Sequence, residues 1–298
     1  MDTPPAMRRA SHGKLSLAYE VIGPDHGRPL LLLMGVGAQM LTWHDDFCWA
    51  LARSGFQVVR MDNRDAGLST HLSDLGEPKV VDMILRPKRA ARYSLTDMAA
   101  DAFAVCDAMG WDNVNVVGGS MGGMIAQTMA IERPRRVRSL TSIMSSPSAR
   151  IGRASVRTSV KVAGLLQQQV HSPEEAGRQL VEMYKMIGTS PSVYPLDADW
   201  LHEVGARSYA RAYDPAGKLR QQAAMLSAPN RTAALRKLRV PTLVMHGSAD
   251  VMIRPSGGRA TADAVPDSRL VMLPDVGHGA FPREVWPTMI EEITAISV

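Results

Sequence analysis

Cysteine is scarce in this sequence, and Cys48 and Cys106 are the only two. Two cysteines cannot build the disulfide framework that holds a small secreted domain together. Each of them lies in a segment with helical periodicity, where a small buried thiol is the ordinary explanation. The cysteine content therefore predicts a reducing compartment.

Long apolar runs are also missing. The longest run, residues 29–34, has the length of a strand, and the two arginines near the N-terminus are not followed by the apolar stretch of a signal peptide. We therefore expect no membrane span and a cytoplasmic protein.

Clusters that would bind nucleic acid or metal ions are lacking as well. The sequence has 34 lysines and arginines and 29 acidic residues, which gives a net charge of +5. The basic residues are scattered along the chain and are not interleaved with aromatic residues, as they would be in a nucleic-acid-binding groove. The densest basic stretch, residues 86–92, is interpreted as a solvated loop rim. The histidines are dispersed, and neither an H-E-x-x-H motif nor paired C-x-x-C motifs occur. We expect no nucleic-acid partner, no metal and no organic cofactor.

Short apolar runs alternate along the chain with segments of helical periodicity. An edge strand is predicted at 14–21 and further strands at 30–34, 57–62, 114–117, 140–144, 240–246 and 269–273. Helices are predicted at 43–54, 94–109, 123–132 and 256–264 and after Pro287, with Ser94 and Asp97 capping one of them and Gly110 ending it. Because helices join successive strands, the sequence predicts an α/β fold with a mostly parallel sheet.

The alternation stops for about ninety residues after the strand at 140–144. Helical segments and several prolines replace it until the strand that begins near Val240. We interpret residues 146–238 as an inserted helical cap and residues 1–145 and 239–298 as the core domain.

The segment Gly118–Gly122 matches the pattern G-x-S-x-G, with Ser120 between a predicted strand and a predicted helix. That context is typical of a nucleophile elbow, in which a sharp turn exposes a serine hydroxyl at the carboxyl end of a sheet. Glycines at the flanking positions let the strand and the helix approach each other closely. We interpret Ser120 as a nucleophile.

A serine hydroxyl needs an imidazole to remove its proton, and the imidazole needs a carboxylate to hold its tautomer. His278 and Asp250 each lie in a loop that follows a predicted strand, and the chain order Ser, Asp, His is that of α/β-hydrolases. Asp275 is the rival carboxylate, but it lies only three residues from His278. His246, inside a strand, is interpreted as a packed core histidine. The sequence predicts catalytic roles for Ser120, Asp250 and His278.

Ester hydrolysis also needs N–H donors for the oxyanion of the tetrahedral intermediate. Met121 follows the nucleophile and supplies one donor by its position. The loop after the strand at 30–34 supplies the other, and Gly35 and Gly37 on either side of Val36 let that backbone approach a substrate. We predict an oxyanion hole formed by the backbone N–H groups of Val36 and Met121.

In these motifs the chain resembles members of the α/β-hydrolase superfamily. Along nearly its whole length it resembles the branch that contains aclacinomycin methylesterase-like and mycobacterial esterase- and lipase-like proteins. The resemblance is carried by residues 32–35, Trp43, residues 60–69, Gly118–Gly123, residues 240–244 and Gly277-His278. Met34-Gly35 stands where many relatives have His-Gly, a departure shared by this branch. The resemblance implies a Ser-Asp-His hydrolase with a helical cap, and a structural salt bridge of Arg64 beneath the site.

The resulting hypothesis is a serine carboxylesterase, with methyl esters among its candidate substrates, that forms an acyl-enzyme on Ser120. A carbon–carbon bond hydrolase or a lactonase would use the same three residues, and a catalytically idle binding protein is the alternative outside the enzymes. Apolar residues of the inserted region are candidates for a pocket that takes an apolar ester. They are Met183, Tyr184, Met186, Tyr194, Trp200, Tyr209, Tyr213 and Met225. The oligomeric state, a homodimer included, stays open.

Overall fold

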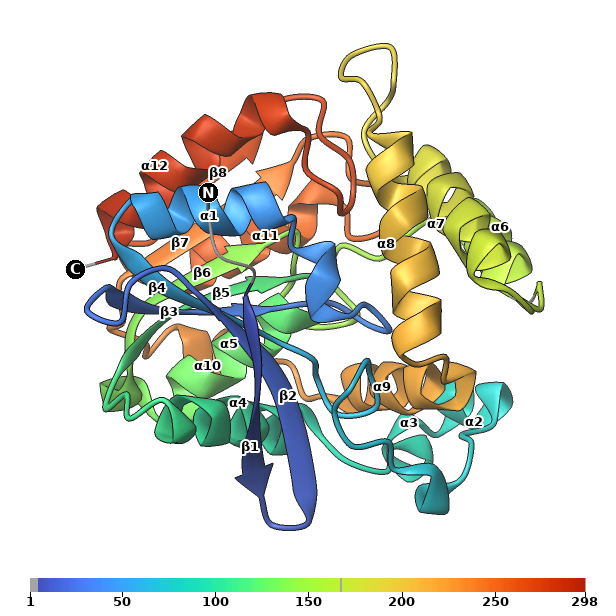
Figure 1. The fold of residues 1–298 in the computed structure, drawn as a ribbon, viewed down its shortest axis with the longest axis horizontal. Helices are drawn as coiled ribbons and strands as arrows, with labels where there is room; N and C mark the ends of the chain where they lie inside the picture. The colour runs from blue at the N-terminus through green and yellow to red at the C-terminus, as the bar shows by residue number, and fades with distance from the viewer. Residues whose placement is uncertain (1–4, 167, 298) are drawn as a thin grey trace.

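A single eight-stranded sheet organises the computed structural model, which describes residues 5–166 and 168–297 (Figure 1). The strands lie in the order β1-β2-β4-β3-β5-β6-β7-β8. Their bounds are β1 Ala6–His12, β2 Leu15–Ile22, β3 Arg28–Leu33, β4 Phe56–Met61, β5 Val114–Gly119, β6 Val137–Ile143, β7 Thr242–Gly247 and β8 Arg269–Leu273. Pairing from β4 to β8 is parallel throughout, whereas β1 with β2 and β2 with β4 are antiparallel. The prediction of a mostly parallel sheet is confirmed.

The prediction of an edge strand at 14–21 is wrong in one respect. The strand exists as β2, but it pairs on both sides, and β1 forms the edge of the sheet instead. Most side chains of β1 are exposed, so its sequence lacks the apolar alternation by which a strand is recognised.

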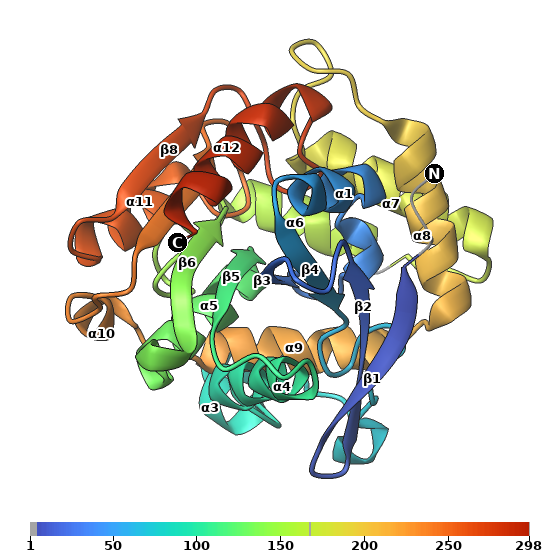
Figure 2. The ribbon, with the colours of Figure 1, turned by 60° about the vertical axis from the view of Figure 1, so that its left-hand side comes forward.

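Helices cover both faces of the sheet (Figure 2). Helices α1 (Asp45–Arg53) and α12 (Trp286–Ile296) lie on one face, and α4 (Leu95–Ala108) and α5 (Met121–Glu132) pack together on the other. The buried side chains accordingly form two large apolar clusters, one on each side of the sheet. The capping box that Ser94 and Asp97 form at the start of α4 is present as predicted, and Gly110 after its end has φ 70°.

Helical structure occupies the stretch between β6 and β7. It comprises α6 (Val156–Leu166), α7 (Pro173–Ile187), α8 (Ala198–Arg211), α9 (Pro215–Ser227) and the short α10 (Thr232–Leu235). Helices α7 and α8 pack together at one edge of the molecule, while α9 packs on α2 (Val80–Leu85) and α3 (Pro87–Ala90). Helix α10 lies against α5 and α11 (Pro255–Ala264), which belong to the layers around the sheet. The division of the chain at residues 146 and 238 stays a prediction.

Within the residues that the structure describes, no helix is both long enough and apolar enough to cross a membrane.

Candidate active site

Ser120 lies in the sharp turn between β5 and α5. Its φ of 55° and ψ of −118° place it in a region that a residue with a side chain rarely adopts, which costs on the order of 1–3 kcal/mol. Close packing around the turn requires glycine: a Cβ atom on Gly118 would lie 2.2 Å from the Gly122 carbonyl oxygen, and one on Gly122 would lie 2.2 Å from the Leu33 carbonyl oxygen. This backbone conformation places the half-buried Ser120 side chain beyond the end of β5.

Two loops at the same edge of the sheet bring His278 and Asp250 to Ser120. Asp250 follows β7 and His278 follows β8, and parallel strands place their carboxyl ends together. The Nε2 atom of His278 lies 3.2 Å from Ser120 Oγ, and its Nδ1 atom lies 2.8 Å from Asp250 Oδ2. The structure therefore places the three residues in one hydrogen-bonded chain.

The Asp250 carboxylate is held ionised although it is buried. Burial by itself would raise its pKa, but the adjacent His278 and hydrogen bonds from His246 and His278 lower the pKa to about 2. Its Oδ1 atom also accepts the amide N–H groups of Met252 and Ile253, at 2.8 and 2.9 Å. An ionised Asp250 favours a proton on His278 Nδ1, which leaves Nε2 free to accept one from Ser120.

The rival carboxylate lies elsewhere. Asp275 is exposed, and its amide N–H donates to Ser248 Oγ at 2.8 Å, while His278 faces Asp250. His246 is fully buried, as predicted, but no sequence pattern indicated that its Nε2 atom would lie 3.3 Å from Asp250 Oδ2. The same atom lies 2.7 Å from the Ile253 carbonyl oxygen. His246 thus helps to define the position of Asp250.

The loop after β3 passes close to Ser120. A Cβ atom on Gly35 would lie 3.1 Å from Ser120 Cβ and 3.5 Å from Ser120 Oγ. Met121 is the first residue of α5, where backbone N–H groups have no partner within the helix. Among the described residues, the N–H groups of Val36 and Met121 donate to no other group. Both predicted oxyanion donors therefore belong to segments that adjoin Ser120, and their role stays a prediction.

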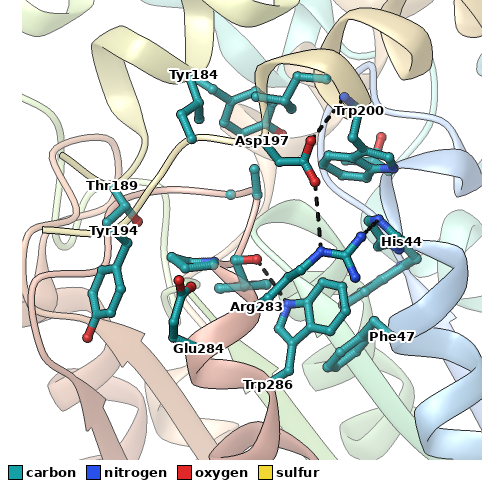
Figure 3. Close-up of a pocket in the computed structure, with 18 of the residues that line it drawn as sticks. His44, Phe47, Tyr184, Thr189, Tyr194, Asp197, Trp200, Arg283, Glu284 and Trp286 are labelled. Atoms are coloured by element: carbon teal, nitrogen blue, oxygen red, sulfur yellow. Dashed lines mark hydrogen bonds and ion pairs between the residues drawn. The ribbon is translucent and has the colours of Figure 1, made fainter. Parts of the chain in front are cut away.

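An apolar cavity of about 270 Å³ lies next to these residues, between the core and the inserted helices (Figure 3). Figure 3 shows Phe47 and Trp286 on the core side, with Tyr184 and Trp200 contributed by the inserted helices. Met144 lies between the cavity and the turn that carries Ser120, because it lines the cavity and its Cε atom would lie 3.1 Å from a Cβ atom on Gly119.

Only part of the predicted pocket lining contributes to this cavity. Tyr184, Tyr194 and Trp200 line it, and the other five candidates do not. Tyr209 and Tyr213 instead pair with each other at a centroid distance of 4.9 Å. The core contributes more of the wall than the sequence suggested, through residues that no motif marks: Thr42, His44, Phe47, Phe281, Arg283 and Trp286.

The end of α7 holds the loop that carries His278. The amide N–H of His278 donates to the Ile187 carbonyl oxygen at 2.8 Å, and that of Gly277 donates to Thr189 Oγ1 at 3.0 Å. A Cβ atom on Gly279 would lie 2.5 Å from Tyr184 Cε1, so the tyrosine ring packs directly on this loop. These contacts were not foreseen, because they join segments about ninety residues apart and no local pattern encodes them.

The predicted salt bridge of Arg64 is confirmed. The guanidinium donates to both carboxylate oxygens of Asp101 in α4, with 2.8 Å between Nη2 and Oδ1, and it stacks over the Tyr93 ring at 5.0 Å. The bridge fixes the loop at residues 62–69 against the layer of helices below it.

Asp65, His71 and Asp214 could together offer ligand atoms to a cation, since these atoms lie within 4.8 Å of one another. Arg220 already occupies this position: it donates to both oxygens of Asp65, at 2.7 and 2.9 Å, and to Asp214 Oδ2 at 2.9 Å. His71 Nδ1 lies 2.7 Å from the same oxygen of Asp214. The group is accounted for as an ion-pair cluster.

The sheet order and this constellation define an α/β hydrolase, and a family comparison agrees. The model of the α/β hydrolase fold family matches residues 28–284, so the chain belongs to that family.

Proteins of several kinds match the chain over most of its length. The chain is 28% identical to rhodomycin D methylesterase DauP of Streptomyces sp. (strain C5), over 97% of both proteins. It is 27% identical to BpoC of Mycobacterium tuberculosis, over 90% of this chain and 92% of that protein. Among solved structures, the esterase RhEst1 of Rhodococcus superposes with a TM-score of 0.74 at 22% identity, covering 98% of each chain. The last of these likenesses concerns the fold alone.

Proposed function

We propose that this protein hydrolyses a carboxylic ester through an acyl-enzyme on Ser120. The observation that carries the proposal is the hydrogen-bonded chain from Asp250 through His278 to the strained Ser120 at the carboxyl edge of the sheet. Ionised Asp250 supports a positive charge on His278, and His278 is within reach of the hydroxyl proton.

Each proton in the proposed reaction passes through His278. Ser120 Oγ attacks the ester carbonyl carbon while His278 Nε2 takes its proton, and the oxygen that becomes negative accepts the N–H groups of Val36 and Met121. Collapse of this intermediate breaks the bond to the alcohol, which leaves with the proton from His278. A water molecule then attacks the acyl carbon and gives a proton to His278. The bond between the acyl carbon and Ser120 Oγ breaks, His278 returns the proton to Oγ, and the acid is released.

The cavity favours an apolar, aromatic-sized group on one side of the ester. Its walls carry Phe47, Trp200 and Trp286, whose rings offer flat apolar surfaces, and Arg283 lies at its rim with Asp46 as ion-pair partner at 2.7 Å. The named methylesterase relatives support a methyl ester of a bulky apolar acid as the first class to test.

The test compares the purified protein with Ser120→Ala, Asp250→Asn and His278→Ala on p-nitrophenyl and methyl esters of aliphatic and aromatic acids. We expect the variants to fold and to lose on the order of 10⁴- to 10⁶-fold in kcat, as subtilisin does when triad residues are removed. An aromatic lactone and a vinylogous diketone are assayed in parallel. If the protein hydrolyses only the lactone or only the diketone, and no ester, the proposal of ester hydrolysis is replaced by lactone hydrolysis or carbon–carbon bond hydrolysis, respectively. A folded parent as inert as Ser120→Ala on every compound would favour a binding protein.

A further inference from the structure

The loop at residues 34–38, which carries the N–H of Val36, is held by side chains from two other segments. The amide N–H of Gly37 donates to Gln221 Oε1 at 2.7 Å, and Gln221 Nε2 donates to the Arg64 carbonyl oxygen at 2.6 Å. From the opposite end of the loop, the Met34 carbonyl oxygen accepts Asn63 Nδ2 at 2.9 Å. Gln221 belongs to α9, and its side chain is fully buried.

Helix α9 also covers the loop. Gly37 has φ 67°, and a Cβ atom there would lie 2.8 Å from Cγ and 2.9 Å from Cδ of Lys218. Lys218 and Gln221 are three residues apart, so they share one face of α9, and that face rests on the loop.

These contacts fix the direction of the Val36 N–H. Two peptide planes meet at the Cα atom of Val36. The first plane contains the Gly35 carbonyl and the Val36 N–H, and the second contains the Val36 carbonyl and the Gly37 N–H. The Gly35 carbonyl oxygen accepts the Ala38 N–H at 3.3 Å, while Gln221 holds the Gly37 N–H. Without the amide of Gln221, the second plane would lose its only side-chain partner among the described residues.

We propose that Gln221 is a positioning residue for the oxyanion hole, so that α9 must be seated on the loop for the Val36 N–H to face the reacting carbonyl. The inference rests on the proposed function for its catalytic consequence, whereas the bracing of the loop stands on the hydrogen bonds alone. It makes the helical insertion part of the catalytic apparatus as well as a wall of the cavity.

The test compares Gln221→Leu with Gln57→Leu. Gln57 is a matched control, because its buried amide also makes two side-chain hydrogen bonds, to Asp25 at 3.0 Å and from Trp111 at 3.2 Å. It lies near the amino-terminal end of β4, whereas Ser120 lies beyond the carboxyl ends of the parallel strands. The first readout is amide hydrogen exchange of the segment 34–40. We expect exchange about tenfold faster in Gln221→Leu than in the parent and in Gln57→Leu, the factor that corresponds to one lost hydrogen bond.

The second readout is kinetic. We expect kcat of Gln221→Leu to fall about 10- to 100-fold with KM unchanged, less than the loss from removing an oxyanion donor outright. A trifluoromethyl ketone, which forms a tetrahedral anion on a serine, should lose affinity by the same factor, whereas the product acid should bind as before.

Unchanged hydrogen exchange in the segment 34–40 would contradict the proposal that Gln221 braces the loop. Faster exchange with kcat and ketone affinity equal to those of Gln57→Leu would overturn the catalytic role. A parent that hydrolyses no ester would defeat the proposed function and leave the exchange result to decide the bracing.

Discussion

Gly35 shows how little room one residue has beside Ser120. A methyl group there would meet Ser120 Cβ at 3.1 Å, closer than ordinary contact, so either the loop or the serine must shift by a few tenths of an ångström. We predict that Gly35→Ala lowers kcat about 10- to 100-fold, because a small displacement of the oxyanion donors weakens their bonds in the transition state. Stopped-flow acylation with a p-nitrophenyl ester measures the effect.

The control for Gly35→Ala is Gly164→Ala. Gly164 lies within α6, and a Cβ atom there would meet nothing within 4 Å. Alanine in place of an exposed helical glycine should stabilise the protein by about 0.5–1 kcal/mol and leave kcat unchanged. A Gly35→Ala variant with the parent's kcat would show that the loop does not act on the reaction.

Asp250 links the site to stability in acid. Its pKa of about 2 in the folded protein lies below the ordinary value of 3.8, so the ionised carboxylate stabilises the fold by about 2 kcal/mol at neutral pH. The depressed pKa fixes the sign: this contribution is complete above pH 3.8 and is lost as the pH falls from there toward 2.

We therefore predict that the stability difference between the parent and Asp250→Asn narrows as the pH is lowered from 6 to 3. Urea unfolding at each pH measures it, and subtracting one protein from the other removes the contributions of the remaining carboxylates. A difference that is the same at pH 6 and pH 3 would contradict the assignment of a low pKa to Asp250.

At the residue scale, the sequence identified the side chains whose role depends on a local pattern. Ser120, Asp250 and His278 each follow a strand within a short motif, and the structure places them within hydrogen-bond distance of one another. Gln221 was not singled out, and His246 was interpreted only as a core histidine, because their contacts are with residues 184 and four positions away and neither spacing forms a pattern.

At the scale of elements, α9 is attached to the core through an ion-pair cluster. His71 follows β4, and its two ring nitrogens lie 2.7 Å from Asp214 Oδ2 and 2.9 Å from the Gly67 carbonyl oxygen. Asp214 caps α9 by accepting the Gly217 N–H. Burial opposes a charge on His71, but the Gly67 carbonyl and the Asp214 carboxylate raise the pKa of the ring above 6.5.

Because the pKa of His71 is raised in the folded protein, its stabilising contribution is complete below pH 6.5 and is lost as the pH rises through the folded value. We predict that the thermal midpoint of the parent exceeds that of His71→Asn at pH 6 and that this advantage shrinks by pH 9. Taking the difference between the two proteins removes the contributions of other groups that titrate between pH 6 and pH 9. One of them is Lys218, because burial lowers its pKa to about 8. An advantage that grows with pH would show that His71 is neutral in the folded state.

Elements with a strong local signal were predicted best. Helix α4 has a capping box and a terminal glycine, and its observed ends differ by one residue from those expected. The arrangement of α6 to α9 could not be derived in the same way. The sequence pattern of an amphipathic helix shows which of its faces is buried, but it does not show which part of the protein packs against that face. The sequence therefore offered eight candidates without distinguishing the three that line the cavity from the five that do not.

At the scale of the whole molecule, alternating strands and helices were enough to predict a parallel α/β sheet, because right-handed crossovers leave few other topologies. The strand order and the extra edge strand β1 depend on pairing between segments distant in the chain, so they emerged only from the structure. The layered architecture has an energetic consequence, because each face of the sheet has its own apolar cluster. The cluster on the side of α1 and α12 includes Met34 and Met144 near Ser120, but we predict that its part beneath α12 can be perturbed without changing the reaction.

Ile293 in α12 tests this separation. Its side chain is fully buried in the cluster that includes Leu243 and Met245 of β7, so Ile293→Ala leaves a cavity and should lower the free energy of unfolding by about 2–5 kcal/mol. Ile290→Ala, on the same helix but only half-buried, should cost about half as much. Urea denaturation gives both values. Active-site titration with a fluorophosphonate gives kcat per folded molecule, which we expect to equal that of the parent in both variants. If kcat fell in step with stability instead, the sheet would transmit strain from α12 to the nucleophile, and the two faces could not be treated as independent layers.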